Sequence, residues 1–235
     1  AIDAPKIQKY EWLKLKEYGL KEAYIRKLMK EFGAYSDMFI ASNFNLFSDK
    51  FKSTLEKVDK VDVSRILETH NKSSVRIISA KDNEYPSDIK KLVDFPTFLY
   101  VKGNEMHRER KIAVVGTRKV TKFGKASCEK IVKDLLEYDI TIVSGLAEGI
   151  DTIALNIAVQ KNNNPIAIVG TGLDIVYPFE NREIWEKIGR EGTIISEYPL
   201  GTSAQKWNFP KRNRLIAAIS NGVLVAESFH RGGSL

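Results

Sequence analysis

From residue 111 onward, the sequence repeats one unit: a run of apolar residues, a glycine-containing turn and an amphipathic segment of helical period. The apolar runs cover residues 111–116, 140–145, 165–172, 193–199 and 221–227, and the helical segments lie near 123–138, 149–160 and 181–190. Apolar runs that alternate with helices indicate parallel strands covered on both faces of a sheet. We therefore expect an open, doubly wound, mostly parallel α/β domain.

Residues 7–71 have a different pattern, with apolar side chains at helical spacing and Gly19 and Gly33 where helices should end. The stretch YGLKEAYIRKLMKEFG looks like a degenerate SAM-like or helix-hairpin-helix unit. Such units bind DNA backbone through glycine-rich hairpins, but only Gly19 occupies the hairpin here, which favours a small interaction or spacer bundle. We expect a helical domain over 1–72 and a second domain over 73–235, the latter beginning with short strands at 75–79 and 97–103.

The chain carries a net charge of +7 and a pI of about 9.3, and the excess is concentrated in two segments. Residues 108–125 and 206–214 together hold eleven basic side chains and one acid, a local charge of +10. Both segments fall at turns where a loop leads into a helix. A concentration of positive charge at such turns suggests a polyanionic partner.

Several classes of protein are disfavoured by composition. The one cysteine, Cys128, allows neither a disulfide nor a zinc cluster within the chain. No apolar run approaches the roughly 18 residues that cross a bilayer, and no signal-peptide pattern opens the sequence. We expect a cytoplasmic protein with no membrane partner, no metal and no cofactor.

The carboxyl ends of the expected strands are the place to look for a ligand site, since open parallel sheets bind ligands there. Glycines at these ends let a phosphate approach the backbone, and Arg118 could hold it with a forked contact. We expect an anion site formed by Gly116, Thr117, Arg118, Lys119, Ser144, Gly145, Gly170 and Gly172.

Enzyme signatures are weak. VVGTRKVTKFG lacks the Gly-x-Gly-x-x-Gly dinucleotide fingerprint, and no phosphate-binding P-loop is present. The three histidines have no motif neighbours, and Glu148 and Asp151 fit a helix start, where carboxylates stabilise the dipole. A hydrolase using Asp174, Glu180 or Glu197 in the same cleft remains the rival interpretation.

The segment KWNFPKRNR combines cations with aromatic rings, a combination that single-stranded nucleic acid requires. Its candidate DNA contacts are Lys206, Phe209, Lys211, Arg212, Asn213 and Arg214. The alternative is that Trp207 and Phe209 belong to the core and the cations form a solvated rim. Asn213 and Arg214 lie inside the expected helix, where they would brace neighbouring loops.

Six segments occur in the order and at about the spacing of one family. They are VVGTRKVTKFG, VSGLAEGIDTIA, GTGLDIVYPFENREI, ISEYPLGT, NFPKRNRLIAAIS and VAES…GGSL. Over residues 112–235 the sequence thus resembles the DNA-processing protein A family (DprA, also called Smf), and WLKL and LMKEFG resemble that family's N-terminal SAM-like domain.

This resemblance implies a Rossmann-like domain that binds single-stranded DNA and loads RecA recombinase during natural transformation, without catalysing a reaction. It implies that Arg118 and Lys206 hold phosphates and that Phe209 contacts a base, which leaves Trp207 to packing. It also implies a homodimer formed through the Rossmann-like domain. Members of the family continue past the position of Leu235, so the sheet is expected to be incomplete at that edge.

Two other functions stay open. The broader superfamily includes phosphoribohydrolases resembling the LOG family, whose Pro-Gly-Gly-x-Gly-Thr loop supports a catalytic glutamate. HRGGSL, at residues 230–235, is a partial match that lacks the proline and the threonine. Alternatively, the helical N-terminal region is the main interaction module and the α/β domain is its scaffold.

Overall fold

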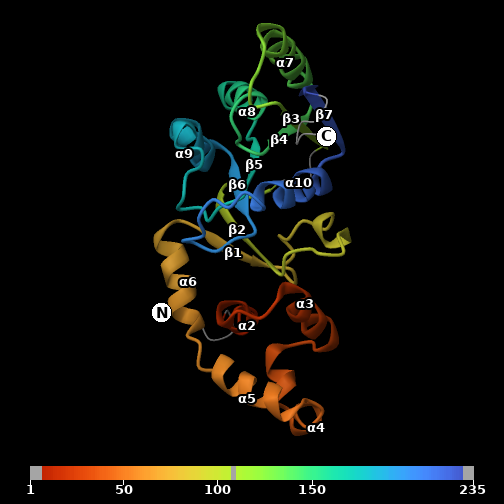
Figure 1. Ribbon diagram of the computed structural model, residues 1–235, viewed down its shortest axis with the longest axis vertical. Helices are drawn as coiled ribbons and strands as arrows, with labels where there is room; N and C mark the ends of the chain where they lie inside the picture. Colours follow the sequence, from red (N-terminus) through yellow and green to blue (C-terminus); the bar gives the residue numbers. More distant parts are fainter. Residues whose placement is uncertain (1–6, 107–109, 230–235) are drawn as a thin grey trace.

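The computed structural model describes residues 7–106 and 110–229, within which seven strands form one sheet (Figure 1). The strands are β1 (Arg76–Ser79), β2 (Phe98–Gly103), β3 (Arg110–Gly116), β4 (Ile140–Ser144), β5 (Ile166–Val169), β6 (Thr193–Ser196) and β7 (Gly222–Glu227). Their spatial order is β1-β2-β6-β5-β4-β3-β7. Strands β6, β5, β4, β3 and β7 are parallel, whereas β1 and β2 add an antiparallel pair at one edge. The predicted fold class is confirmed.

Four helices connect the parallel strands: α7 (Lys122–Leu135), α8 (Ile150–Gln160), α9 (Arg182–Glu191) and α10 (Asn208–Ile219). The chain moves from β3 to β6 in one direction, and α10 then carries it back to β7 on the other side of β3. The strand order therefore reverses between β3 and β7. Such a reversal opens a crevice at the carboxyl ends of the two strands, because their connections leave on opposite faces.

Alternating side chains along the strands fill a separate core on each face of the sheet. Ala113, Val143 and Ile168 pack with Leu215 and Ile216 of α10. The opposite face packs against α7 and α8 through Val114, Ile142, Cys128 and Ala154. Helices thus cover both faces, which explains why the strands are apolar without interruption.

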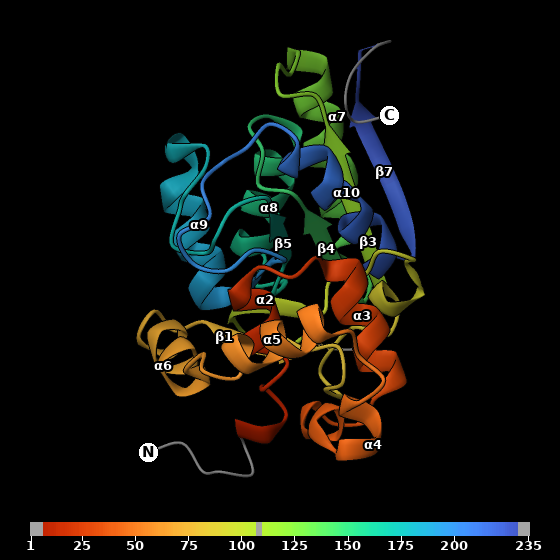
Figure 2. The same cartoon turned by 60° about the horizontal axis from the view of Figure 1, so that its bottom comes forward.

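The N-terminal region consists of short helices: α2 (Leu13–Tyr18), α3 (Glu22–Glu31), α4 (Ala41–Phe44), α5 (Asp49–Val58) and α6 (Val63–Lys72). As predicted, Gly19 ends α2 in a left-handed conformation, with φ of 97°. Figures 1 and 2 show these red and orange helices at one end of the molecule, against β1 and β2. One hydrophobic cluster includes Trp12, Leu28, Tyr100 and Trp185, so the helices share a core with the sheet. The division into domains at residue 72 stays a prediction.

A half-buried lysine, Lys16, joins the N-terminal helices to the sheet. Lys16 Nζ lies 2.9 Å from Glu22 Oε1 and donates a hydrogen bond to the carbonyl oxygen of Glu197 at 3.3 Å. Burial by itself would lower the pKa of Lys16, but Tyr100, Glu22 and Glu197 outweigh this effect and raise it. The ammonium group therefore stays charged and fixes α2 beside the carboxyl end of β6. Within the described residues, no helix has both the length and the apolar character needed to cross a membrane.

Candidate nucleic-acid interface

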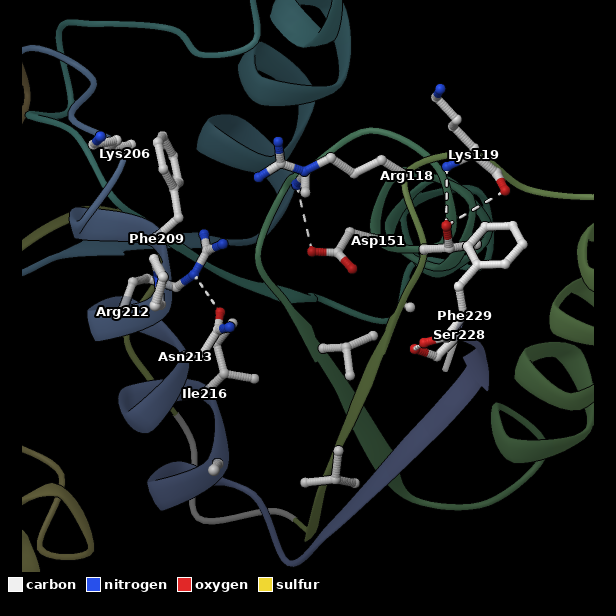
Figure 3. Close-up of a pocket in the computed structure, with 17 residues that line it drawn as sticks. Arg118, Lys119, Asp151, Lys206, Phe209, Arg212, Asn213, Ile216, Ser228 and Phe229 are labelled. Carbon is white, nitrogen blue, oxygen red and sulfur yellow. Dashed lines mark hydrogen bonds between the residues drawn. The ribbon is translucent and has the colours of Figure 1, made fainter. Parts of the chain in front are cut away.

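A groove of about 560 Å³ lies at the point where the strand order reverses (Figure 3). One wall is the turn after β3, which carries Arg118 and Lys119, and the facing wall is α10, which carries Phe209 and Asn213. Lys206 stands at the start of the α10 wall. Residues far apart in the sequence therefore meet where the fold predicts a ligand.

Hydrogen bonds to the end of β7 and within the turn itself fix the backbone of the turn after β3. Thr117 donates its backbone N–H to the carbonyl oxygen of Glu227 at 2.7 Å, and its hydroxyl oxygen accepts the backbone N–H of Lys119 at 3.1 Å. The side chains of Arg118 and Lys119 are exposed. The Arg118 guanidinium lies 6.0 Å from the centre of the Phe209 ring. The hydrogen-bonded turn thus presents two exposed cations to solvent beside an aromatic ring.

Phe209 sits in a cluster of rings and cations. A side chain at Gly170 would place Cβ only 3.1 Å from the Phe209 ring, so the ring lies directly on that glycine. The Tyr177 ring is 5.2 Å away at an angle of 33°, and the Arg212 guanidinium lies 5.8 Å from the Phe209 ring centre. Phe209 is half-buried and remains available to a flat ligand.

Arg212 and Asp151 form a buried polar floor beneath this cluster. Arg212 Nη1 donates to the carbonyl oxygens of Gly145 at 2.6 Å and Ile168 at 2.8 Å. Asp151 Oδ2 accepts the backbone N–H of Gly145 at 3.1 Å and of Ala147 at 3.4 Å. Both side chains therefore bind the backbone of the loop after β4, Asp151 from α8 and Arg212 from α10. Arg212 also connects α10 to β5.

Burial dominates the titration of both groups. Desolvation raises the pKa of Asp151 from its ordinary value of 3.8 to about 6, although the Arg212 charge and the two backbone N–H groups act to lower it. Desolvation lowers the pKa of Arg212, against the attraction of Asp151. The arginine remains charged near neutral pH, because the ordinary pKa of an arginine lies far above this range.

This arrangement predicts that the contribution of Asp151 to stability falls as pH rises from about 4 to about 6. The native state, with its raised pKa, keeps a proton in that range that the unfolded chain has lost, which is worth about 3 kcal/mol for a shift of this size. Denaturant unfolding of wild type and Asp151→Asn across this range measures the effect. The wild type should lose more stability than the variant, and parallel curves would refute the prediction.

Two other predicted DNA contacts are engaged within the protein. Arg214 donates to both carboxylate oxygens of Glu197, at 2.6 and 3.1 Å, and to Asp94 at 2.8 Å. Lys211 lies 3.3 Å from the same Glu197 carboxylate. Burial alone would lower the pKa of Arg214, but the two carboxylates outweigh it and raise it. Arg214 therefore braces α10 against β6 and the loop before β2.

The structure brings most of the predicted site residues together. Those that line the groove are Gly116, Thr117, Arg118, Lys119, Lys206, Phe209, Arg212 and Asn213. Gly145 and Gly170 line a smaller cavity beside it. Ser144 and Gly172 line neither cavity. The Ser144 hydroxyl donates a hydrogen bond to the carbonyl oxygen of Val114. Gly172 packs closely against the carbonyl oxygen of Pro199. The assignment of all these residues as DNA contacts stays a prediction.

Trp207 contradicts the expectation that it packs in the core. Its side chain is 62% exposed, because it occupies the N-cap of α10, and the buried positions nearest this end of the helix are held by Asn208 and Arg212. Asn208 donates its side-chain amide to the carbonyl oxygen of Gly170 at 3.0 Å. The N-terminal end of α10 is therefore anchored by polar side chains, and the indole ring faces solvent beside Lys206.

The N-terminus of α7, where many sheets of this type bind phosphate, is filled by the protein's own carboxylate. Glu227 Oε2 accepts the backbone N–H of Thr121 at 2.9 Å, and Oε1 accepts the Thr121 hydroxyl at 2.6 Å. Gly124 has no side chain, which leaves room for this carboxylate. An anion in the groove therefore cannot use the N-terminus of α7, and Arg118, Lys119 and Lys206 supply the exposed positive charge of its walls. No group of three potential metal ligands occurs within residues 7–106 and 110–229.

Sequence reasoning missed two features of this site. Tyr177 meets Phe209 only because the loop after β5 folds toward α10, and an isolated tyrosine before a proline carries no signal of that. Glu227 ends an apolar strand and was not singled out; its role depends on β7 lying beside β3. The partial LOG-like segment, residues 230–235, lies outside the described residues.

Comparison with known proteins identifies the family. The family model described as DNA recombination-mediator protein A matches residues 76–235. The chain belongs to this family. It is 36% identical to DNA processing protein DprA of Streptococcus pneumoniae over 98% of its own length and 82% of the relative. It is 40% identical to protein Smf of Synechocystis over 73% of its length, but spans only 44% of that relative.

Solved structures of the DNA recombination-mediator protein A family agree with this fold. The X-ray structure of DprA from Streptococcus pneumoniae superposes with a TM-score of 0.74 at 34% identity, covering 95% of this chain and 80% of that one. A structure of DNA processing protein A from Helicobacter pylori, which concerns its single-stranded DNA binding mode, superposes with a TM-score of 0.61 at 30% identity. That match covers 68% of this chain and 73% of the other.

Proposed function

We propose that this protein binds single-stranded DNA in the groove between the β3 turn and α10 and delivers it to RecA recombinase. The observation that carries the proposal is the position of Phe209, a half-buried ring with Arg118 6.0 Å from its centre and Lys206 at the same wall of the groove. Aromatic rings stack with unpaired bases, and the cations bind phosphates. A duplex keeps its bases stacked on one another, so it could use only the cations of this site. The Helicobacter pylori relative, with its single-stranded DNA binding mode, supports this choice.

The rival hydrolase is less well supported, because two of the three acids that it was expected to use have other partners within the protein. Glu197 is paired with Arg214 and Lys211, and Asp174 accepts the backbone N–H of Gly201. Glu148 is exposed. Assays of nucleoside monophosphate hydrolysis with wild type and Glu148→Ala discriminate the two functions. Hydrolysis that depends on Glu148, without DNA binding, would favour the hydrolase.

Lys206 provides a quantitative test of the phosphate contacts. We expect Lys206→Ala to weaken binding equally for all base compositions, because phosphate contacts carry no sequence information. Each lost phosphate contact should also reduce the slope of log affinity against log salt by about 0.7 for a single strand. Lys130→Ala, which removes an exposed lysine from the far part of α7, should leave affinity and slope unchanged. An unchanged slope in Lys206→Ala would place this lysine outside the DNA path.

The partner proposals rest on family membership. We infer a cytoplasmic homodimer, formed through the Rossmann-like domain, that loads RecA during natural transformation or recombination. Sedimentation measures the dimer, and RecA filament formation on DNA coated with single-strand binding protein measures loading. A monomer that binds DNA without stimulating RecA would limit the function to DNA binding.

A further inference from the structure

The groove holds a second aromatic ring, on the other side of Arg118 from Phe209 (Figure 3). The ring belongs to Phe229, which lies two residues beyond the end of β7 and is 56% exposed. A single exposed phenylalanine on an open surface needs no explanation. Phe229, however, lines the groove that is proposed to hold DNA, so its ring is available to the same ligand as the ring of Phe209.

Hydrogen bonds fix the segment before Phe229 to the turn after β3. The carbonyl oxygen of Glu227 accepts the backbone N–H of Thr117 at 2.7 Å. The carboxylate of Glu227 accepts the backbone N–H of Thr121 at 2.9 Å and its hydroxyl at 2.6 Å. Because this backbone is held in place without a ligand, stacking on Phe229 would cost less ordering entropy than stacking on a free loop.

Phe229 has cationic neighbours, as Phe209 has. Figure 3 shows Lys119 on the same side of Arg118 as Phe229, whereas Lys206 stands beside Phe209. The side chains of these three cations line the groove and are exposed. Single-stranded DNA needs rings for its bases and cations for its phosphates. The groove supplies both on each side of Arg118.

The remaining lining of the groove suits bases and does not repel phosphates. Val115, Ile216 and Ala217 give the groove an apolar wall. Asp151 is the acid among the described residues that line it. This side chain is 5% exposed, and its carboxylate accepts two backbone N–H groups of the loop after β4. A strand along the groove therefore meets no exposed carboxylate among the described lining residues.

We propose that Phe229 forms a second base site in the groove. One base of the strand stacks on Phe209, a base further along stacks on Phe229, and the phosphates between them meet Arg118 and Lys119. The inference rests on the proposed function, since it assumes that a single strand lies in the groove. It adds the course of the strand, which runs from the start of α10 across the turn after β3 to the end of β7.

Fluorescence anisotropy with two labelled strands of equal length tests the second base site. One strand is oligo-dT, and the other is an abasic strand that keeps the sugar–phosphate chain without its bases. We expect Phe229→Ala to weaken oligo-dT binding by about fivefold, the lower end of what one stacked base contributes. Its affinity for the abasic strand should equal that of wild type, because no base is present to stack. The slope of log affinity against log salt should also keep the wild-type value, because no phosphate contact is lost.

Three further variants serve as controls for Phe229→Ala. Phe123→Ala removes a phenylalanine that is 81% exposed on α7 and does not line the groove, so it should bind both strands normally. Phe229→Tyr keeps a flat ring and should bind as wild type does. The double variant Phe209→Ala, Phe229→Ala should lose the product of the two single losses in affinity, because each ring contacts a different base.

Unchanged affinity of Phe229→Ala for oligo-dT would overturn the second base site. An equal loss of affinity for both strands would also overturn it, because the ring would then act through the shape of the groove. A double variant that binds no more weakly than the weaker single variant would mean that both rings contact one base, which contradicts two separate sites. Failure of wild type to bind oligo-dT would instead reject the proposed function itself.

Discussion

Replacing Arg118 with alanine is expected to lower the affinity for single-stranded DNA by at least about tenfold, the largest binding effect of any single substitution in the groove. Arg118 lines both the groove and the smaller cavity beside it, and its guanidinium lies 6.0 Å from the Phe209 ring centre. The carboxylate of Glu227 already occupies the N-terminus of α7, so the N–H groups of this helix cannot replace the arginine as a phosphate ligand. Electrophoretic mobility shift or anisotropy at low salt measures the loss.

Two variants serve as controls for Arg118. Arg118→Lys keeps the charge but loses the planar fork, so it should retain only part of the affinity. Arg190→Ala removes an exposed arginine from the last turn of α9, away from the groove, and should bind normally. Because Arg118 is exposed, its loss should leave the unfolding midpoint unchanged. If Arg118→Ala binds as Arg190→Ala does, the strand does not pass this turn.

Replacing Arg212 with alanine is expected to reduce the free energy of unfolding by about 3–5 kcal/mol near neutral pH. The guanidinium is buried and donates to the carbonyl oxygens of Gly145 and Ile168. Its removal leaves those carbonyls and the buried Asp151 carboxylate uncompensated. Denaturant unfolding monitored by circular dichroism measures the loss.

Two measurements separate the effect of leaving Asp151 without a counter-charge from the effect of the cavity that Arg212→Ala creates. The double variant Arg212→Met, Asp151→Asn removes both charges and fills most of the volume, so it should be more stable than Arg212→Ala. The cost of Arg212→Ala should also shrink below about pH 6, where Asp151 can take up a proton. A loss below about 1 kcal/mol, or one independent of pH, would contradict the view that Arg212 compensates a buried charge.

The parallel part of the sheet was predictable from sequence because its strands are buried on both faces. The apolar runs 111–116 and 193–199 show no alternation of polar and apolar residues; β3 begins one residue before the first run, and β6 lies within the second. The position of β7 beside β3 was not predictable from periodicity, since it depends on the crossing direction of α10. That crossing brings Glu227 onto Thr121 and opens the groove.

The candidate site was predictable to a similar extent. Glycine turns and local charge pointed to Arg118, Lys206 and Phe209, and these residues do meet across the groove. Charge counting alone did not separate the exposed cations from Arg214, whose partner Glu197 lies 17 residues earlier, directly after β6. The position of Arg214 inside the expected helix did predict that it braces neighbouring loops, as it does through Glu197 and Asp94. Trp207 shows the same limit: an aromatic residue beside an apolar helix suggested packing, but its N-cap position turns it to solvent.

Competition between oligo-dT and a duplex of equal length, measured by anisotropy over a series of salt concentrations, tests the central claim most directly. If the strand lies between Arg118 and Phe209, the protein should bind the single strand far more tightly than the duplex. Its affinity should also fall steeply with salt, because several phosphates are neutralised at once. Equal binding of duplex and single strand at every salt concentration would mean that DNA binds only through contacts between the cations and its phosphates. That result would contradict the proposed role of Phe209.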